Sequence, residues 1–101
     1  MINVIASISI KEGKLSDYLR ILKANVPLVR KEKGCIEYVP ALDIETGIAA
    51  QVLERNVVTI LERWESMEAL NAHLASPHML EYRNKVKDMV DRLSVKVLKS
   101  I

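Results

Sequence analysis

The segment from Trp64 to Met79, WESMEALNAHLASPHM, contains the only tryptophan and both histidines of the chain. These residue types suit acid–base chemistry on an aromatic compound. The imidazole of His73 or His78 can exchange a proton near neutral pH, and an indole offers a flat apolar surface with one N–H donor. The same pattern is also typical of a core tryptophan followed by an ordinary helix, so the direction of the three side chains decides between the two interpretations.

Four more polar residues could join such a site. Tyr82 lies on the apolar face of a predicted helix, where a buried hydroxyl needs a hydrogen-bond partner, and the adjacent Arg83 could neutralise an anion or lie exposed. Tyr38 could form part of a pocket wall. Glu62 alternates onto the same strand face as Trp64, where it could accept a phenolic proton or form an ion pair at an interface.

Composition and the absence of known motifs argue against several classes of function. The chain contains no GxGxxG, P-loop, CxxC or HExxH motif. Its 15 basic and 13 acidic residues are interspersed without a dense basic stripe, so we expect no nucleic-acid interface. Cys35 cannot form an internal disulfide, and no apolar run approaches the ~20 residues that span a bilayer. The start, MINVIASISI, lacks the charged leader of a signal peptide. We therefore expect a soluble, cytoplasmic, single domain over residues 1–101.

The first third of the chain predicts a strand and a helix. Apolar and polar residues alternate over 2–10, as in a strand buried on one face. From Leu15 to Val29 apolar residues recur at helical spacing for about four turns. Pro27 is expected to kink or shorten the last turn, and Gly34 is typical of a glycine cap after the helix.

Two strands and a long connection are predicted next. A strand over 35–43 must lie at a sheet edge or contain a bulge, because Pro40 has no N–H to donate. Residues 57–65 alternate like the first strand. The segment between them, 44–56, is too long for a tight turn, and we interpret it as an extended hairpin or flap.

Two helices are predicted in the last third. Ser66 is a favourable N-cap for a short helix over 67–75. Ser76 as N-cap and Pro77 at the first helical position indicate the start of a second helix. The apolar face of this second helix is predicted to include Met79, Tyr82, Val86, Met89 and Leu93.

A last strand over 94–100 gives the order strand, helix, strand, strand, helix pair, strand. This order is typical of the ferredoxin-like, split βαβ arrangement, an α+β fold with an antiparallel sheet. Both helical segments are expected to cover one face of the sheet. The other face would then expose apolar residues, and a homodimer that closes sheet against sheet is the expected solution.

The same residues resemble a known family. WESMEALNAHLASPHM is similar to the Trp-Glu-Ser, Ala-His-Leu and Ser-Pro-His signature of antibiotic biosynthesis monooxygenase domains, which are dimeric α+β barrels. The resemblance extends over the chain through INVIASISIKEGK, KEKGCIEY and DRLSVKVL. Within the family, the small bacterial quinol monooxygenases are most similar in two segments, DIETGIAAQVLERNVVTILERWES and PHMLEYRNKVKDMV.

The resemblance implies that a quinol or related polycyclic phenol or anthrone reacts with dioxygen without flavin, haem or metal. A deprotonated quinol is a strong one-electron reductant, so it can pass an electron to dioxygen directly. The protein then supplies an apolar pocket, a base and donors for the developing oxyanion. The implied partners are a small aromatic substrate, dioxygen and a second copy of the chain, with no cofactor, metal, nucleic acid or membrane.

Seven residues are the candidates for this chemistry. Trp64 is expected to pack against the substrate ring with its N–H toward a ring oxygen, while His73 or Tyr82 contacts a ring oxygen. The expected catalytic residues are His73, Tyr82 and Trp64. The expected substrate-binding residues are Tyr38, Glu62, His78 and Arg83.

Departures from relatives leave alternatives open. Anthrone oxygenases carry asparagine and tyrosine where this chain has Ile60 and Leu70, so their polar clamp is not reproduced. The haem-degrading branch has its tryptophan and iron-ligating histidine at positions that match His73 and Arg83, and arginine cannot ligate iron. A related isomerase of a phosphorylated autoinducer product shares the histidine-rich helix junction. A non-catalytic dimeric barrel that binds a small hydrophobic ligand is the other alternative.

Overall fold

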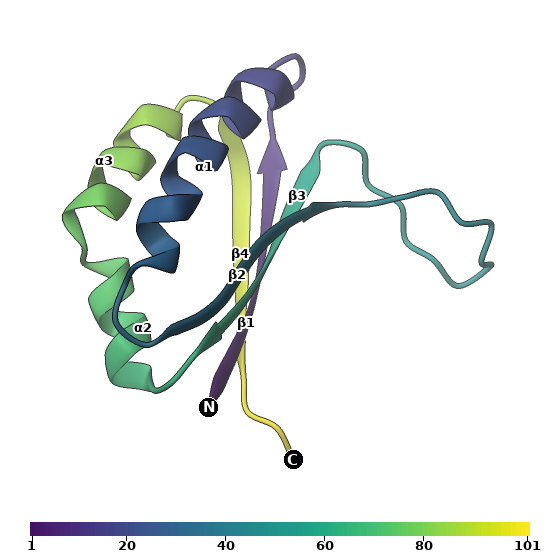
Figure 1. Ribbon diagram of the computed structural model, residues 1–101. Coiled ribbons are helices and arrows are strands. Elements are labelled where there is room, and N and C mark those ends of the chain that lie inside the picture. Colours follow the sequence, from purple (N-terminus) through teal and green to yellow (C-terminus); the bar gives the residue numbers. More distant parts are fainter.

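Seven elements make up the chain, and the computed structural model describes all of residues 1–101. They are β1 (Ile2–Ile10), α1 (Leu15–Arg30), β2 (Cys35–Leu42), β3 (Val57–Trp64), α2 (Met67–Leu74), α3 (Pro77–Val86) and β4 (Val90–Leu98). The four strands form one antiparallel sheet in the order β2–β3–β1–β4. All three helices lie on the same face of this sheet (Figure 1). The predicted ferredoxin-like α+β fold is confirmed.

The strand register determines which residues face the helices, because side chains alternate between the two faces of a sheet. One row across the sheet consists of Tyr38, Glu62, Val4 and Val97. The next two rows consist of Pro40, Ile60, Ala6 and Val95, and of Leu42, Val58, Ile8 and Leu93. Glu62 is therefore the one charged residue in three rows of an otherwise largely apolar surface.

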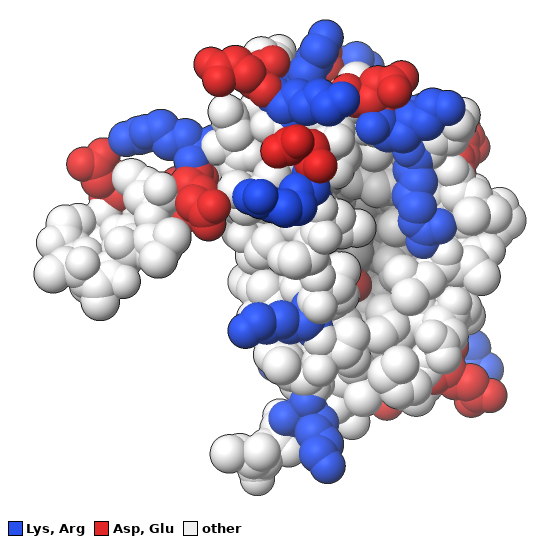
Figure 2. Space-filling view, turned by 180° about the vertical axis from the view of Figure 1, so that it is seen from behind, with Lys and Arg blue, Asp and Glu red and all other residues white.

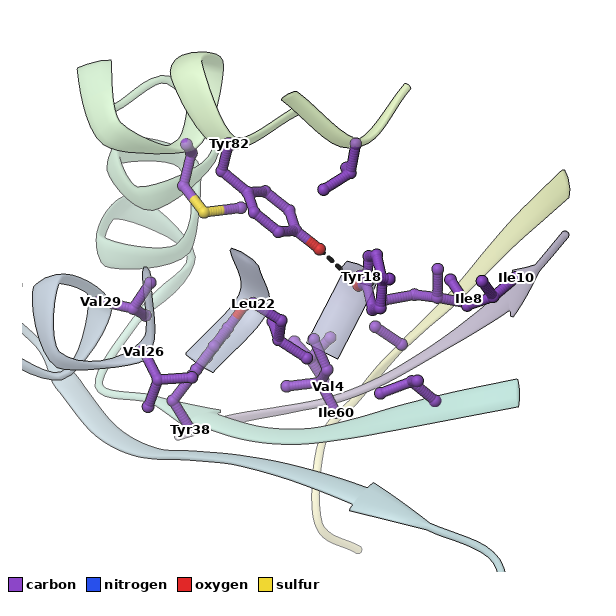
Figure 3. Packing of buried hydrophobic residues seen from close by; sticks show 14 of the residues in the cluster. Val4, Ile8, Ile10, Tyr18, Leu22, Val26, Val29, Tyr38, Ile60 and Tyr82 are labelled. Carbon is purple, nitrogen blue, oxygen red and sulfur yellow. Dashed lines mark hydrogen bonds between the residues drawn. The ribbon is translucent and has the colours of Figure 1, made fainter. Parts of the chain in front are cut away.

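The main core lies under α1 and α3, which pack side by side over the centre of the sheet (Figures 1 and 3). Leu22 and Val29 of α1 are fully buried, and they belong to the same core cluster as Val58 and other strand residues. Between the helices, the hydroxyl groups of Tyr18 and Tyr82 lie 2.5 Å apart, and the dashed line in Figure 3 marks this hydrogen bond. This contact ties α1 to α3 above the sheet.

The helices leave β4 uncovered. Leu93, Val95 and Val97 of β4 pair with Ile8, Ala6 and Val4, so they point toward the helix side of the sheet. All three side chains are nevertheless about half exposed. The helix side therefore has an apolar opening between α3 and β4.

The connection between β2 and β3 leaves the sheet as a long irregular loop, residues 43–56 (Figure 1). β2 and β3 pair with each other, as the hairpin interpretation predicted, and β2 is an edge strand, as Pro40 required. Ile44, Ile48 and Val52 are exposed along this loop. None of the helices in the chain is both long and apolar enough to span a membrane.

The end of α3 differs from its prediction. The helix ends at Val86, Met89 lies in the turn that follows, and Leu93 lies on β4. The predicted helical face is therefore wrong beyond Val86, and the last strand begins at Val90 instead of residue 94. Met89 and Leu93 continue a helical spacing by coincidence, since a short apolar run fits either period.

Two smaller expectations are also corrected. Helix α1 continues for three residues past Pro27 to Arg30, so the proline does not shorten it. Ser76 occupies the N-cap position of α3, but its hydroxyl does not cap the helix and donates to the carbonyl of His73 at 2.8 Å. Ser66, by contrast, caps α2 as predicted, because its Oγ accepts the N–H of Ala69.

Candidate active site

A cavity of about 510 Å³ lies between the sheet and helices α2 and α3. Its floor consists of nine of the twelve residues in the three rows that face the helices, all except Pro40, Leu42 and Val58. Fourteen of its eighteen lining residues are hydrophobic. It opens to solvent between α3 and β4, where Figure 2 shows a hollow in the surface. This size and this lining are typical of sites for small organic ligands.

Polar groups gather at the end of the cavity where β2, β3 and α2 meet. Tyr38, Glu62 and His73 all line it there. The Tyr38 hydroxyl, Nε2 of His73 and one carboxylate oxygen of Glu62 have no hydrogen-bond partner in the chain. No unpartnered side-chain nitrogen or oxygen is sealed inside the protein. These three groups are therefore open to the cavity and free to bind a ligand.

His73 is held on three sides. Its ring lies on Trp64, with ring centroids 4.5 Å apart, and meets the edge of Tyr38 at 5.7 Å. Its Nδ1 lies 2.8 Å from Oε2 of Glu32, and the side chain is only 2% exposed. Because Nδ1 faces a carboxylate, we assign the proton of the neutral ring to Nδ1. Nε2 is then an acceptor that faces the cavity.

Glu32 is a site residue that the sequence did not predict. It follows α1, and its Oε2 contacts both Nδ1 of His73 and Nε2 of His78 at 2.8 Å. The Glu32 side chain is 13% exposed. The two histidines are 41 and 46 residues away along the chain, so no local spacing reveals this cluster. The one signal in the sequence is an acidic residue at a helix C-terminus, where the helix dipole favours cations.

The turn that carries Glu32 depends on Gly34. Gly34 has a φ of +85°, in the left-handed region that favours glycine. A Cβ at this position would lie 2.5 Å from Cβ of Ala69 in α2. The Gly34 carbonyl accepts the N–H of Glu65 at 2.9 Å. The turn therefore packs directly on the start of α2 and brings Glu32 to His73.

Trp64 lies behind the cavity and does not line it. The side chain is fully buried, and Nε1–H donates to Oε1 of Glu62 at 2.9 Å. Trp64 ends β3, and the chain folds back through α2 so that His73 covers the indole. The indole therefore does not line the cavity in which we expected it to pack against a substrate ring. Instead, Trp64 supports His73 and orients Glu62.

The other predicted residues are divided among different places. Tyr82 lines the cavity, but its hydroxyl already has Tyr18 as a partner. Arg83 lines the rim, and its Nη2 donates to the carbonyl of Leu74 at 2.5 Å. His78 does not line the cavity and reaches the site only through Glu32. The structure thus brings four predicted residues to the cavity wall and a fifth to its rim. His78 and Trp64 lie behind it.

Burial changes the proton affinity of the cavity groups. Desolvation raises the pKa of the Glu62 carboxyl, while the hydrogen bond from Trp64 acts in the opposite direction. Desolvation also raises the pKa of the Tyr38 hydroxyl far above its usual range, and the nearby charge of Glu62 adds to this effect. Tyr38 therefore stays neutral at physiological pH and can donate a hydrogen bond to a ligand.

The donor set does not resemble a metal centre. No group of three or more His, Cys, Asp or Glu side chains is arranged to hold a metal ion. The nitrogens of His73 and His78 both point at one oxygen of Glu32, at hydrogen-bond distance. A metal-binding arrangement would instead direct all of these atoms at a shared central position, about 2.0–2.2 Å from each.

Comparison with known proteins gives consistent results. The family model for antibiotic biosynthesis monooxygenase matches residues 1–85. The probable quinol monooxygenase YgiN of Escherichia coli K12 is 35% identical over 104 aligned positions, which cover 97% of this chain and 96% of YgiN. Among solved structures, Rv0793 of Mycobacterium tuberculosis is similar with a TM-score of 0.83 and 28% identity, over 99% of this chain and 94% of Rv0793. A conserved protein of Methanosarcina mazei Go1 has a TM-score of 0.85 at 23% identity, over 99% and 92% of the two chains.

Proposed function

Because the chain belongs to the antibiotic biosynthesis monooxygenase family, we propose that it is a cofactor-independent monooxygenase of a quinol or a related polycyclic phenol or anthrone. One observation supports this proposal most directly. An apolar cavity ends at an unpartnered imidazole nitrogen of His73, beside a hydroxyl donor and a carboxylate. A flat phenol needs such a cavity for its rings and such a base for its proton.

The first step is the removal of a phenolic proton. With the rings on the apolar floor, the phenolic O–H points at His73, its bond breaks, and Nε2 takes the proton. Glu32 stabilises the resulting imidazolium through its 2.8 Å contact with Nδ1. Glu62 accepts a hydrogen bond from a second phenolic hydroxyl, and Trp64 holds Glu62 in place for this contact.

The second step is the reaction with dioxygen. The quinolate passes one electron to dioxygen, and the radical pair recombines to form a bond between a ring carbon and oxygen. The O–O bond of this peroxide then breaks, so that one oxygen atom stays on the ring and the other leaves as water. All four electrons for this reduction come from the substrate. The neutral Tyr38 hydroxyl can donate a hydrogen bond to the oxygen that gains negative charge.

Oxygen uptake with a panel of reduced naphthoquinones and anthrones tests the proposal. We expect at least one compound to accelerate oxygen consumption well above its autoxidation rate, with a hydroxylated quinone or anthraquinone as product. Uptake should persist after treatment with a chelator, because neither proposed step needs a metal. The proposal fails if no compound is consumed faster than without protein, or if one specific metal is needed to restore the activity.

The two other functions have less support. A phosphorylated substrate, as for the related isomerase, needs several converging cations or N–H donors. The cavity offers only Arg83 and Lys87, which lie at its rim, while Glu62 at the inner end would repel a phosphate. Simple binding of a hydrophobic ligand would not require an unpartnered base. The oxygen measurement separates this last function from catalysis.

A further inference from the structure

We propose that the substrate is an aromatic acid, with a carboxylate at the end opposite the reacting phenol, and that Lys87 binds this carboxylate at the rim of the cavity. The inference rests on the proposed function of the same cavity and adds the class of substrate. Three features of the cavity support it: the sign of its charges, their distance from the reacting end and the effect of Glu62 on orientation.

The rim carries positive charge without a partner. Apart from His73 and the tyrosines, the ionisable residues that line the cavity are Glu62, Arg83 and Lys87. The ion pairs of the chain include neither Arg83 nor Lys87. Lys85, which does not line this cavity, is paired with Glu81 at 3.1 Å. Figure 2 shows Lys and Arg side chains beside the hollow. Arg83 of α3 and Lys87, which follows it, thus line the cavity without an acidic partner.

Lys87 lies away from the reacting end. Glu62 belongs to the row of Val4, and the row of Ile8 is four residues further along β1, about 14 Å away at strand spacing. Lys87 follows the last residue of α3, close to the start of β4, which pairs with the end of β1. Arg83 is one helical turn earlier, and its Nη2 donates to the carbonyl of Leu74, the residue next to His73, so its guanidinium lies nearer the inner end. A molecule of two or three fused rings can therefore reach both ends.

The charges also select one orientation. A carboxylate placed at the inner end would meet Glu62 and lose its hydration without a cation in exchange. At the rim it keeps part of its hydration and gains a charge-assisted hydrogen bond from Lys87. The C-terminal pole of α3 offsets part of this attraction, but the full charge of Lys87 exceeds the half charge of a helix end. The phenol is then directed at His73.

Two ligands of equal size test the inference, 6-hydroxy-2-naphthoic acid and its uncharged amide. Neither is a quinol, so calorimetry measures their affinities apart from turnover. We expect the wild-type protein to bind the acid about 10-fold more tightly than the amide at low salt, with a smaller ratio at high salt. In Lys87→Gln this ratio should fall by about 3- to 10-fold.

Lys85→Gln is the matched control, because it removes a cation from the same helix outside the cavity. Its acid-to-amide ratio should equal that of the wild-type protein. The inference is overturned if the wild-type protein does not prefer the acid, or if both variants lower the ratio equally. A preference for the acid without oxygen uptake by any quinol would refute the proposed function alone. Uptake without that preference would refute this inference alone.

Discussion

At the residue scale, the central feature is a buried histidine between a carboxylate and an open cavity. His73, Tyr38 and Glu62 were predictable as candidates, because a helix border and strand alternation place them on the inner face. Glu32 could not be predicted, because its contact with His73 joins residues 41 positions apart. The position of Trp64 could not be predicted either, since the sequence does not reveal that α2 folds back over the end of β3.

Glu32→Gln tests whether the carboxylate assists His73. The amide keeps the size of the side chain but removes the negative charge that stabilises the imidazolium. We expect kcat for quinol oxygenation to fall by about 10- to 100-fold with little change in KM, as for loss of general-base help. His78→Gln, which changes the other contact of Glu32, should lower kcat much less. Equal losses in both variants would indicate that the cluster serves only to hold the fold.

Glu62→Gln tests how much the buried charge of Glu62 destabilises the folded protein. Burial raises the pKa of Glu62 above its ordinary value of 4.5, so the folded state binds this proton more tightly than the unfolded state. The stability from this group is complete below pH 4.5 and is lost as pH rises through the raised pKa. We therefore expect Glu62→Gln to gain in Tm relative to the wild-type protein between pH 4.5 and pH 8. Parallel Tm curves over this range would contradict the direction of the shift.

At the element scale, apolar periodicity predicted the strands, the long helix and the helix pair, and their order predicted the fold. The residues at which the helices and strands begin and end were harder to predict. Val90 starts β4 although Met89 and Leu93 continue the helical spacing, because pairing with β1 outweighs the local pattern. The opening between α3 and β4 was also beyond prediction. The opening depends on how much of the sheet α3 covers, and no local sequence pattern indicates this.

Gly34 and Gly13 give a test of the turn that positions Glu32. Both have positive φ, but a Cβ would meet Ala69 only at Gly34 and nothing within 4 Å at Gly13. Gly13→Ala should cost about 1 kcal/mol for the backbone alone. Gly34→Ala should cost a further ~1–3 kcal/mol for the clash. Denaturant unfolding of both variants measures the difference, and equal free energies of unfolding would contradict the close packing of the turn on α2.

At the scale of the whole molecule, the open face of the sheet and the 43–56 loop remain uncovered. Val39, Leu61 and Leu98 are exposed on the open face among polar residues, and the loop exposes three more aliphatic side chains. Asn3, Ser7 and Ser9 of β1 also lie on this face, as the alternation over residues 2–10 predicted.

We expect a homodimer that covers the open face and the loop. Light scattering at micromolar concentration should give twice the mass of the chain. Leu61→Lys, at the exposed centre of β3, should shift the mass toward that of a monomer because it places a charge in the interface. A monomeric mass for the wild-type protein would count against the sheet-to-sheet dimer.

The incorporation of labelled oxygen by the wild-type protein and by His73→Ala tests the proposed chemistry most directly. A quinol from the oxygen-uptake panel is mixed with ¹⁸O₂, and the product is analysed by mass spectrometry against an autoxidation control. The wild-type protein should place one ¹⁸O atom on each product molecule. His73→Ala should keep the circular dichroism of the folded protein but form this product about 100-fold more slowly, because the base is lost. Equal rates of labelled product from the two proteins would show that His73 is not the base.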